Sequence, residues 1–243
     1  MSLIKTQLFC IPYAGASATM YMPWTNLVED HIHIRPVELA GRGSRFDEPP
    51  SLNFSDALDD VLQQIIPLAD KGPYAIFGHS MGAVLAFEVY YQLLNKKYPK
   101  PSHLFLSGRP APREKSKKNG LHQMIRDKLN KFFILKGGIP KELAKHPDLA
   151  KSFRKVLQSD LGWMASYHFQ PKPVKVDCPV TIFCGLGDRI RREDAAAWNN
   201  YVSSPCTITW IEGDHFFLNS YTQELVSSIN QAIPKHSSNK ENA

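Results

Sequence analysis

Six short, almost continuously apolar runs recur along the chain, each bounded by Gly, Pro or Asp. They are rich in β-branched and aromatic side chains, which is typical of strands that are buried on both faces. The runs cover residues 6–12, 32–37, 73–78, 102–107, 178–184 and 206–211. Because strands covered on both faces belong mainly to parallel sheets, the pattern predicts a mostly parallel central sheet.

Helical periodicity fills the intervals between these runs. In residues 54–69 apolar side chains from Leu58 to Ile66 recur every three or four positions, which places them on one side of a helix. Residues 81–95 and 220–232 show a similar pattern. The alternation of strands with helices predicts an α/β fold in which helices flank the sheet.

One long segment, residues 112–168 or close to it, breaks the alternation because it holds no convincing strand. Apolar side chains recur there at helical spacing on both sides of a Gly-Gly pair, and Pro140 suits the first turn of a new helix. The pattern predicts a helical insertion that covers the sheet as a lid, with an ordinary packed helical layer as the alternative. Residues 1–234 then form one domain, and the polar residues 235–243 are expected to be a disordered tail.

The composition supports a single globular domain. The chain has 243 residues, of which 43% are hydrophobic and 21% charged, and this excludes collagen, coiled coil and general disorder. No apolar run approaches the roughly 20 residues of a membrane span, and the N-terminus lacks the parts of a signal peptide. The four cysteines form no CxxC pair and no zinc-type spacing with His. We therefore expect free thiols, a cytoplasmic protein, and neither a metal nor a cofactor.

The net charge of +6 is concentrated in one segment. Residues 113–155 hold 13 Lys or Arg against 4 Asp or Glu, so the remainder of the chain is slightly acidic. A solvated helical surface explains this pattern, and so does a docking face for an acidic protein partner. Nucleic-acid binding is not expected because no binding motif accompanies the charge.

The run Gly78-His79-Ser80-Met81-Gly82 has the form G-x-S-x-G. It stands between an apolar strand and a helix, which is the setting in which a sharp turn exposes a nucleophilic serine above a sheet. The N-terminus of the following helix stabilises negative charge that develops there. A serine that only caps a helix is the alternative, and the two glycines favour the nucleophile.

A serine hydroxyl needs a base and an orienting acid to become a nucleophile. In folds with this elbow the chain order is Ser, then acid, then His, each after a strand. Asp188 and His215 follow the last two predicted strands and fit that order. The competing residues are, for the acid, Glu193, Asp194 and Asp214 and, for the base, His103 and His168.

The tetrahedral intermediate of acyl transfer needs an oxyanion hole of two backbone N–H groups. Met81, which follows the serine, supplies one in this type of site, and the loop after an early strand supplies the other. In the small-residue loop 12–16 the predicted donor is Ala14, with Tyr13 next. His79, inside the elbow, is predicted to be a structural or pocket residue.

Nearly the whole chain resembles the type II (external, editing) thioesterases of nonribosomal peptide and polyketide synthesis, a branch of the α/β-hydrolases. The matching blocks are residues 9–17 (F-P-x-A-G-G-S in the family), 38–49 (L-P-G-R-G-x-R-x-x-E-P), 77–82 (F-G-H-S-M-G), 138–142 (G-G-x-P) with the later acidic Asp160, and 213–218 (G-x-H-F-F-L). Ala16 and Ala40 depart from the family's Gly and Pro. The segment 184–190, which presents the acid, is a looser match.

The resemblance implies an α/β-hydrolase fold with a helical lid and a monomeric enzyme. Its substrate would be an acyl thioester on the phosphopantetheine arm of a carrier protein, from which it removes stalled or aberrant groups. Carrier proteins are usually acidic, so the basic segment would dock the carrier. The side chains expected to contact the acyl group are Tyr13, Phe132, Phe133, Trp163, Met164 and Phe216. For the four that lie in the insertion, from Phe132 to Met164, plain core packing is the alternative.

Other functions share part of this pattern. A small-molecule carboxylesterase has the same Ser-His-Asp triad, and a chain-releasing thioesterase of fatty-acid synthesis also resembles these blocks. A non-catalytic subunit of a synthase complex belongs to a different class, and the complete triad argues against it.

Overall fold

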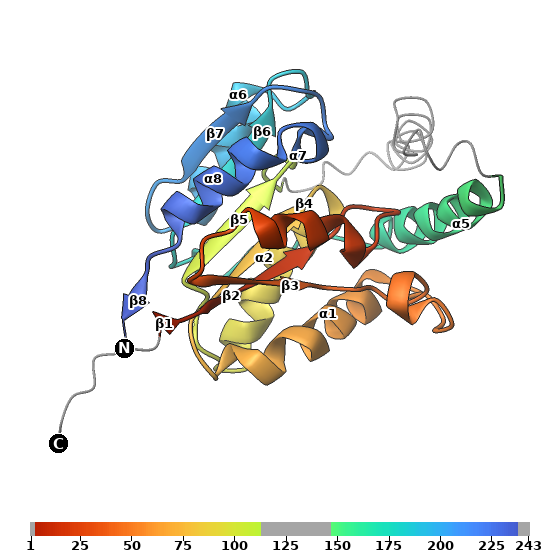
Figure 1. Ribbon diagram of the computed structural model, residues 1–243, viewed down its shortest axis with the longest axis horizontal. Helices are drawn as coiled ribbons and strands as arrows, with labels where there is room; N and C mark the ends of the chain where they lie inside the picture. Colours follow the sequence, from red (N-terminus) through yellow and green to blue (C-terminus); the bar gives the residue numbers. More distant parts are fainter. Residues whose placement is uncertain (1–2, 113–146, 238–243) are drawn as a thin grey trace.

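The computed structural model describes residues 3–112 and 147–237 (Figure 1). Its centre is a six-stranded, wholly parallel sheet with the strand order β3-β2-β4-β5-β6-β7. The strands are β2 (Thr6–Ile11), β3 (Ile32–Pro36), β4 (Tyr74–His79), β5 (His103–Ser107), β6 (Val180–Gly185) and β7 (Thr207–Ile211). Each lies where the apolar runs predicted a strand, so the predicted α/β fold with a parallel central sheet is confirmed.

Two long helices, α1 (Phe54–Ala69) and α2 (Met81–Asn95), have the bounds that the periodicity predicted. They pack on each other, and α2 also packs on β4 and β5. The predicted helix at residues 220–232 is α8 (Thr222–Ala232), and a short helix, α7 (Phe217–Ser220), precedes it. The shorter helical elements are η1 (Ala18–Asn26), η2 (Gly43–Arg45), α6 (Arg192–Ala196) and η3 (Ala197–Tyr201).

The middle of the sheet forms the core. Every residue of β4, β5 and β6 is buried. Phe77, Phe105 and Phe183 come from these three strands, and the ring of Phe183 lies 6.1 Å from that of Phe105 and 6.5 Å from that of Phe77. At the sheet edge, in β7, only Ile211 is buried. Burial on both faces explains why the central strands are continuously apolar in sequence.

The two chain ends meet in a small second sheet. β1 (Leu3–Ile4) pairs antiparallel with β8 (His236–Ser237) (Figure 1). Residues 236 and 237 are therefore strand residues and do not belong to the polar tail that the sequence suggested from 235 onward. Strand pairing uses backbone groups, so the polar side chains gave no sign of it. The rest of that tail, 238–243, lies outside the described residues.

α5 (Pro147–Met164) is the described part of the predicted insertion. It projects from the end of the sheet toward which the arrows of β2 and β5 point (Figure 1). Leu157, Leu161 and Trp163 are buried, so the C-terminal half of this helix is anchored in the core. Residues 113–146, which include Phe132, Phe133 and most of the basic segment, lie outside the described residues, and their role as a lid stays a prediction.

The cysteines agree with the expectation of free thiols. All four cysteines are free, and burial raises the pKa of the Cys10 thiol well above its usual range. Among the described residues, no helix combines the length and the apolar character that crossing a membrane requires.

Candidate active site

Ser80 occupies the sharp turn between β4 and α2. Its backbone has φ 55° and ψ −105°, a left-handed conformation that residues other than glycine rarely adopt. The flanking glycines make the turn possible, because a Cβ at Gly78 would lie 2.1 Å from the carbonyl O of Gly82, and a Cβ at Gly82 would lie 2.2 Å from that of Ile11. The Ser80 N–H donates to Ser107 O on β5 at 2.7 Å. The predicted strand–turn–helix setting is thus confirmed.

The side chains of Asp188 and His215 meet beyond the carboxyl ends of the strands, in the loops after β6 and β7. His215 Nδ1 lies 2.8 Å from Asp188 Oδ2, and both side chains are nearly buried. The loops are tied together by the N–H of Gly187, which donates to Gly213 O at 2.8 Å. The other carboxylate oxygen of Asp188 accepts the Arg189 N–H at 2.6 Å. A carboxylate at Nδ1 holds that proton in place and leaves Nε2 as the basic nitrogen.

The competing acids are used elsewhere. Glu193 is exposed on α6. Asp194 is paired with Arg191, with 3.0 Å between Oδ2 and Nε. Asp214 accepts a backbone N–H two residues further along, with 2.8 Å between the two atoms. Of the four acidic candidates, Asp188 is the one that the structure joins to His215.

The competing histidines also lie apart from this arrangement. His103 begins β5, at the opposite end of the strand from the elbow, and its Nε2 is 2.9 Å from Thr181 Oγ1. His168 lines a cavity of about 480 Å³ together with the ion-paired Glu88 and Lys172. Neither histidine follows a strand of the central sheet as His215 does.

His79 is packed beside His215, and its role as a structural or pocket residue stays a prediction. It is fully buried, its Nδ1 lies 2.8 Å from Ser107 Oγ, and its ring centroid lies 5.0 Å from that of His215. Burial, and secondarily the neighbouring His215, lower the pKa of His79 well below its usual value. His79 is therefore neutral at pH 7.

The loop that follows β2 lies beside the elbow. The ring of Tyr13 packs against His79 at 5.8 Å and against Phe216 at 5.2 Å. Ala14 is buried in the turn that Gly15 continues with φ +85°. Because Met81 is the first residue of α2, its N–H has no acceptor within the helix. The structure thus brings both predicted oxyanion donors to the side of the sheet that holds Ser80.

The remaining predicted acyl contacts are placed with less direct relation to Ser80. Trp163 is buried, its Nε1 donates to Asp160 at 3.2 Å, and its ring lies 6.0 Å from that of Phe54. Met164 is half-buried against the core. Contact of either side chain with an acyl group stays a prediction, as it does for the two phenylalanines outside the described residues.

A buried ion pair beside the loop 12–17 is the main feature that no sequence pattern indicated. Arg42 and Asp160 have side chains that are 5% and 0% exposed, and Arg42 Nη1 lies 2.6 Å from Asp160 Oδ2. The sequence marked these residues only as positions within family blocks. They are far apart in the chain, so no local pattern links them.

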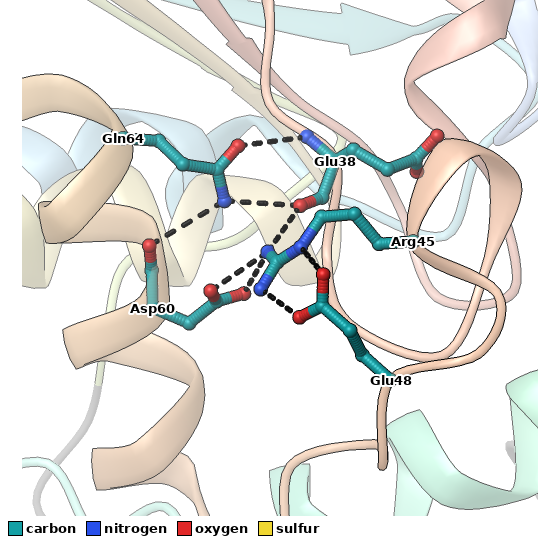
Figure 2. Close-up of polar contacts among 5 residues, drawn as sticks. All are labelled: Glu38, Arg45, Glu48, Asp60 and Gln64. Carbon is teal, nitrogen blue, oxygen red and sulfur yellow. Dashed lines mark hydrogen bonds and ion pairs between the residues drawn. The ribbon is translucent and has the colours of Figure 1, made fainter.

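A second polar network holds the segment that carries Arg42. Arg45 Nη1 donates to both carboxylate oxygens of Asp60 on α1, at 2.7 and 2.8 Å, and to Glu38 O at 2.9 Å (Figure 2). Gln64 on α1 donates to the same carbonyl at 2.9 Å, and Arg45 also pairs with Glu48. These bonds fix the block 38–48 to α1.

Comparison with known proteins gives one consistent picture. Residues 6–233 match the family model described as a thioesterase domain. The gramicidin S biosynthesis protein GrsT of Aneurinibacillus migulanus is 30% identical, with 93% of this chain and 88% of GrsT covered. The medium-chain S-acyl fatty acid synthase thioesterase of Rattus norvegicus is 29% identical, covering 87% and 81%. The crystal structure of ClbQ from the colibactin NRPS/PKS pathway superposes with a TM-score of 0.84 at 32% identity, covering 94% of this chain and 96% of ClbQ.

Proposed function

The chain belongs to the thioesterase family, and on that premise we propose that it is a type II editing thioesterase of nonribosomal peptide or polyketide synthesis. Its substrate is an acyl group held as a thioester on the phosphopantetheine arm of a carrier protein. The observation that carries the proposal is the hydrogen-bonded pair of Asp188 and His215 beyond the carboxyl ends of the strands. Ser80 lies at the same end of the sheet, on a strained turn.

Acylation begins when His215 Nε2 takes the hydroxyl proton of Ser80 and the serine oxygen attacks the thioester carbonyl carbon. The carbonyl π electrons move to the oxygen, and the N–H groups of Met81 and Ala14 stabilise this oxyanion. When the intermediate collapses, the C–S bond breaks, and the leaving pantetheine sulfur takes the proton from His215. The acyl group is then an ester on Ser80.

Deacylation repeats these steps with water as the nucleophile. His215 removes a proton from water, the hydroxide adds to the ester carbonyl, and the oxyanion occupies the same hole. Collapse breaks the bond to Ser80 Oγ, which takes the proton back from His215. Asp188 orients the imidazole throughout and stabilises its cationic form. The products are the free acid and the regenerated enzyme.

The partner is an acyl or peptidyl carrier protein with an acidic surface. The described part of the basic segment supports this assignment, because Lys151, Arg154 and Lys155 are exposed on α5. Complementary charge speeds the encounter of two proteins and fixes their orientation. The enzyme acts as a monomer in the cytoplasm, a compartment in which its four free cysteines stay reduced.

Release of medium-chain acids from a fatty-acid synthase is the second candidate, favoured by the similarity to the rat enzyme. The two functions differ in the acyl groups that they accept. An editing enzyme hydrolyses short and varied acyl groups on carrier proteins, whereas a chain-releasing enzyme has a sharp optimum of chain length. Turnover of one carrier protein loaded with acyl groups of increasing length distinguishes them.

Replacement of the nucleophile tests the chemistry. Ser80→Ala removes the attacking oxygen, and we expect release of acid from an acyl-carrier thioester to fall by about 10⁴-fold or more. The variant keeps Cβ and therefore the packing of the elbow, so its thermal unfolding should match that of the wild type. Acid release is followed by mass spectrometry of the carrier. A folded Ser80→Ala protein that retains turnover would contradict the mechanism.

A further inference from the structure

The geometry behind the active site points to Arg42 and Asp160 as positioning residues. We infer that this buried ion pair clamps the oxyanion loop, residues 12–17, so that the Ala14 N–H faces the reacting carbonyl. The inference rests on the proposed function, because it assigns the residues a role in the same site. Neither residue contacts the substrate. Both act through hydrogen bonds to the backbone of the loop.

Asp160 holds the loop by a backbone N–H. Its Oδ2 accepts the Gly15 N–H at 2.8 Å, and the carboxylate is fully buried. This N–H belongs to the peptide group that joins Ala14 to Gly15, so the bond fixes the orientation of that peptide. Gly15 has φ +85° and no side chain, so the chain itself restricts this turn mainly by one backbone bond, from the Ala16 N–H to Tyr13 O at 3.0 Å.

Arg42 holds the loop by a carbonyl. Its Nη1 donates both to Asp160 Oδ2 at 2.6 Å and to Ala16 O at 3.2 Å, while Nη2 donates to the other oxygen of Asp160. The pair therefore grips the loop at two points, the Gly15 N–H and the Ala16 carbonyl. A bidentate arginine–carboxylate pair is directional, so it fixes geometry as well as charge.

α5 keeps the carboxylate in place. Phe153, Leu157 and Asp160 lie on one face of this helix, at intervals of four and three residues. The face packs directly on the loop, since a Cβ at Gly15 would lie 2.9 Å from Phe153 Cζ and 3.3 Å from Leu157 Cβ. Trp163 Nε1 donates to the second carboxylate oxygen of Asp160 at 3.2 Å.

The choice of an ion pair for this place calls for a reason other than stability. Burying two charges is costly, and apolar residues often replace a buried ion pair without loss of stability. Here the pair's additional hydrogen bonds go to a loop whose residues Ala14, Gly15 and Ala16 have no side-chain group of their own to hold it. Loss of an oxyanion donor lowers kcat by about 10²–10³-fold, so a misdirected donor should lower it by about 10- to 100-fold.

Two variants test the clamp. Asp160→Asn removes the charge that holds Arg42 and Gly15, and Arg42→Lys keeps the buried positive charge but loses the two-point grip. With octanoyl-N-acetylcysteamine as substrate, we expect kcat to fall about 10-fold or more in Asp160→Asn and less in Arg42→Lys. KM should stay within about twofold, because ground-state binding does not use the oxyanion hole.

Inhibitor binding separates positioning from general damage. Ser80 Oγ adds to the carbonyl carbon of hexyl trifluoromethyl ketone, its proton goes to His215, and the carbonyl oxygen becomes an oxyanion in the hole. Affinity for this ketone should fall by about the same factor as kcat in both variants. Affinity for S-octyl-N-acetylcysteamine, a thioether without a carbonyl, should not change.

Glu88→Gln is the matched control. It is also an acid-to-amide change that breaks a nearly buried ion pair, but that pair joins α2 to Lys172 and has no hydrogen bond to the oxyanion loop. We expect a lower melting temperature with unchanged kcat and unchanged ketone affinity.

The outcomes decide between a clamp and a merely structural pair. If Asp160→Asn and Arg42→Lys lose stability but keep the kcat and ketone affinity of Glu88→Gln, the inference is overturned. If Asp160→Asn does not fold, Arg42→Lys decides, because its buried charges stay paired. A wild-type protein that binds the ketone but hydrolyses no thioester would overturn the proposed function alone, since ketone affinity of the variants still tests the clamp.

Discussion

At the scale of single residues, the site depends on backbone positions that only a few side chains tolerate. Ser80 takes a left-handed conformation that costs about 1–3 kcal/mol for a residue with a Cβ. Packing around the turn offsets this conformational energy, because Gly78 and Gly82 let α2 start directly against the sheet. The strained turn therefore exposes the serine, and the packing of the surrounding fold keeps the turn in this conformation.

A buried histidine away from the site makes stability depend on pH. Burial lowers the pKa of His103 to about 4, whereas an unfolded histidine has a pKa of about 6.5. Between these values the unfolded chain binds a proton that the folded chain does not, so stability falls as the pH drops from 7 to 5. This residue alone should account for about 2 kcal/mol of that fall.

His103→Gln removes this titration and leaves His79 in place. We expect the free energy of unfolding of the variant to decrease about 2 kcal/mol less than that of the wild type between pH 7 and pH 5. Urea denaturation at the two pH values measures the difference. Equal losses in both proteins would show that His103 is not kept neutral by burial.

At the scale of elements, contact distances separate glycines that look alike in sequence. Gly82 lies in α2 and Gly162 in α5, and both occupy helical positions. A Cβ at Gly82 would lie 2.2 Å from the backbone oxygen of Ile11, whereas one at Gly162 would meet nothing within 4 Å. The first glycine is required by helix–strand packing, and the second only lowers helix propensity.

Alanine substitution tests this difference. Gly82→Ala should destabilise the protein by about 3 kcal/mol or more, because the backbone that it meets cannot move aside. Gly162→Ala should stabilise it by about 0.5–1 kcal/mol, since alanine restricts the unfolded chain and suits an exposed helix. Denaturant midpoints of the two variants and the wild type measure both effects. The reverse order would show that α2 does not start as close to β2 as described.

At the scale of the whole molecule, charge divides the protein into two parts. The net +6 combines a slightly acidic catalytic core with a strongly basic segment at 113–155. Three basic residues of that segment are exposed on α5, the helix that also carries Asp160, whose carboxylate accepts the Gly15 N–H. A carrier protein that binds this part of the surface would lie close to the proposed active site, which suits delivery of a substrate on a flexible arm.

Charge reversal on α5 tests the docking surface. Replacing Lys151, Arg154 and Lys155 by Glu should raise KM for an acyl-carrier substrate by about 3- to 10-fold at low salt. Added salt should reduce the difference, because it screens exposed charges. KM for octanoyl-N-acetylcysteamine, which has no carrier, should not change.

The matched control reverses Lys71, Lys96 and Lys97, which are exposed beyond the C-terminal ends of α1 and α2, at the opposite end of the sheet. This change alters the net charge by the same amount, so KM for the carrier substrate should stay near the wild-type value. If both triple variants raise KM equally, net charge and not the α5 surface governs the encounter.

The amino-acid sequence by itself determined the fold class and the order of elements. Continuous apolar runs and helical periodicity follow from burial that each element experiences on its own, so the six strands, α1 and α2 could be located from the pattern alone. The elbow at Ser80 could be found in the same way, because a strained strand–turn–helix needs glycines at fixed, local spacing. Asp188 and His215 were located by their place after strands.

Only the tertiary structure decided which distant residues meet. The sequence left Asp194 and Glu193 open as acids, and the 2.8 Å bond between Asp188 and His215 depends on how the β6 and β7 loops lie side by side. The pairing of Arg42 with Asp160, and of β1 with β8, joins positions far apart in the chain. Such contacts arise when complete elements pack together. The local sequence around one partner therefore does not predict the other.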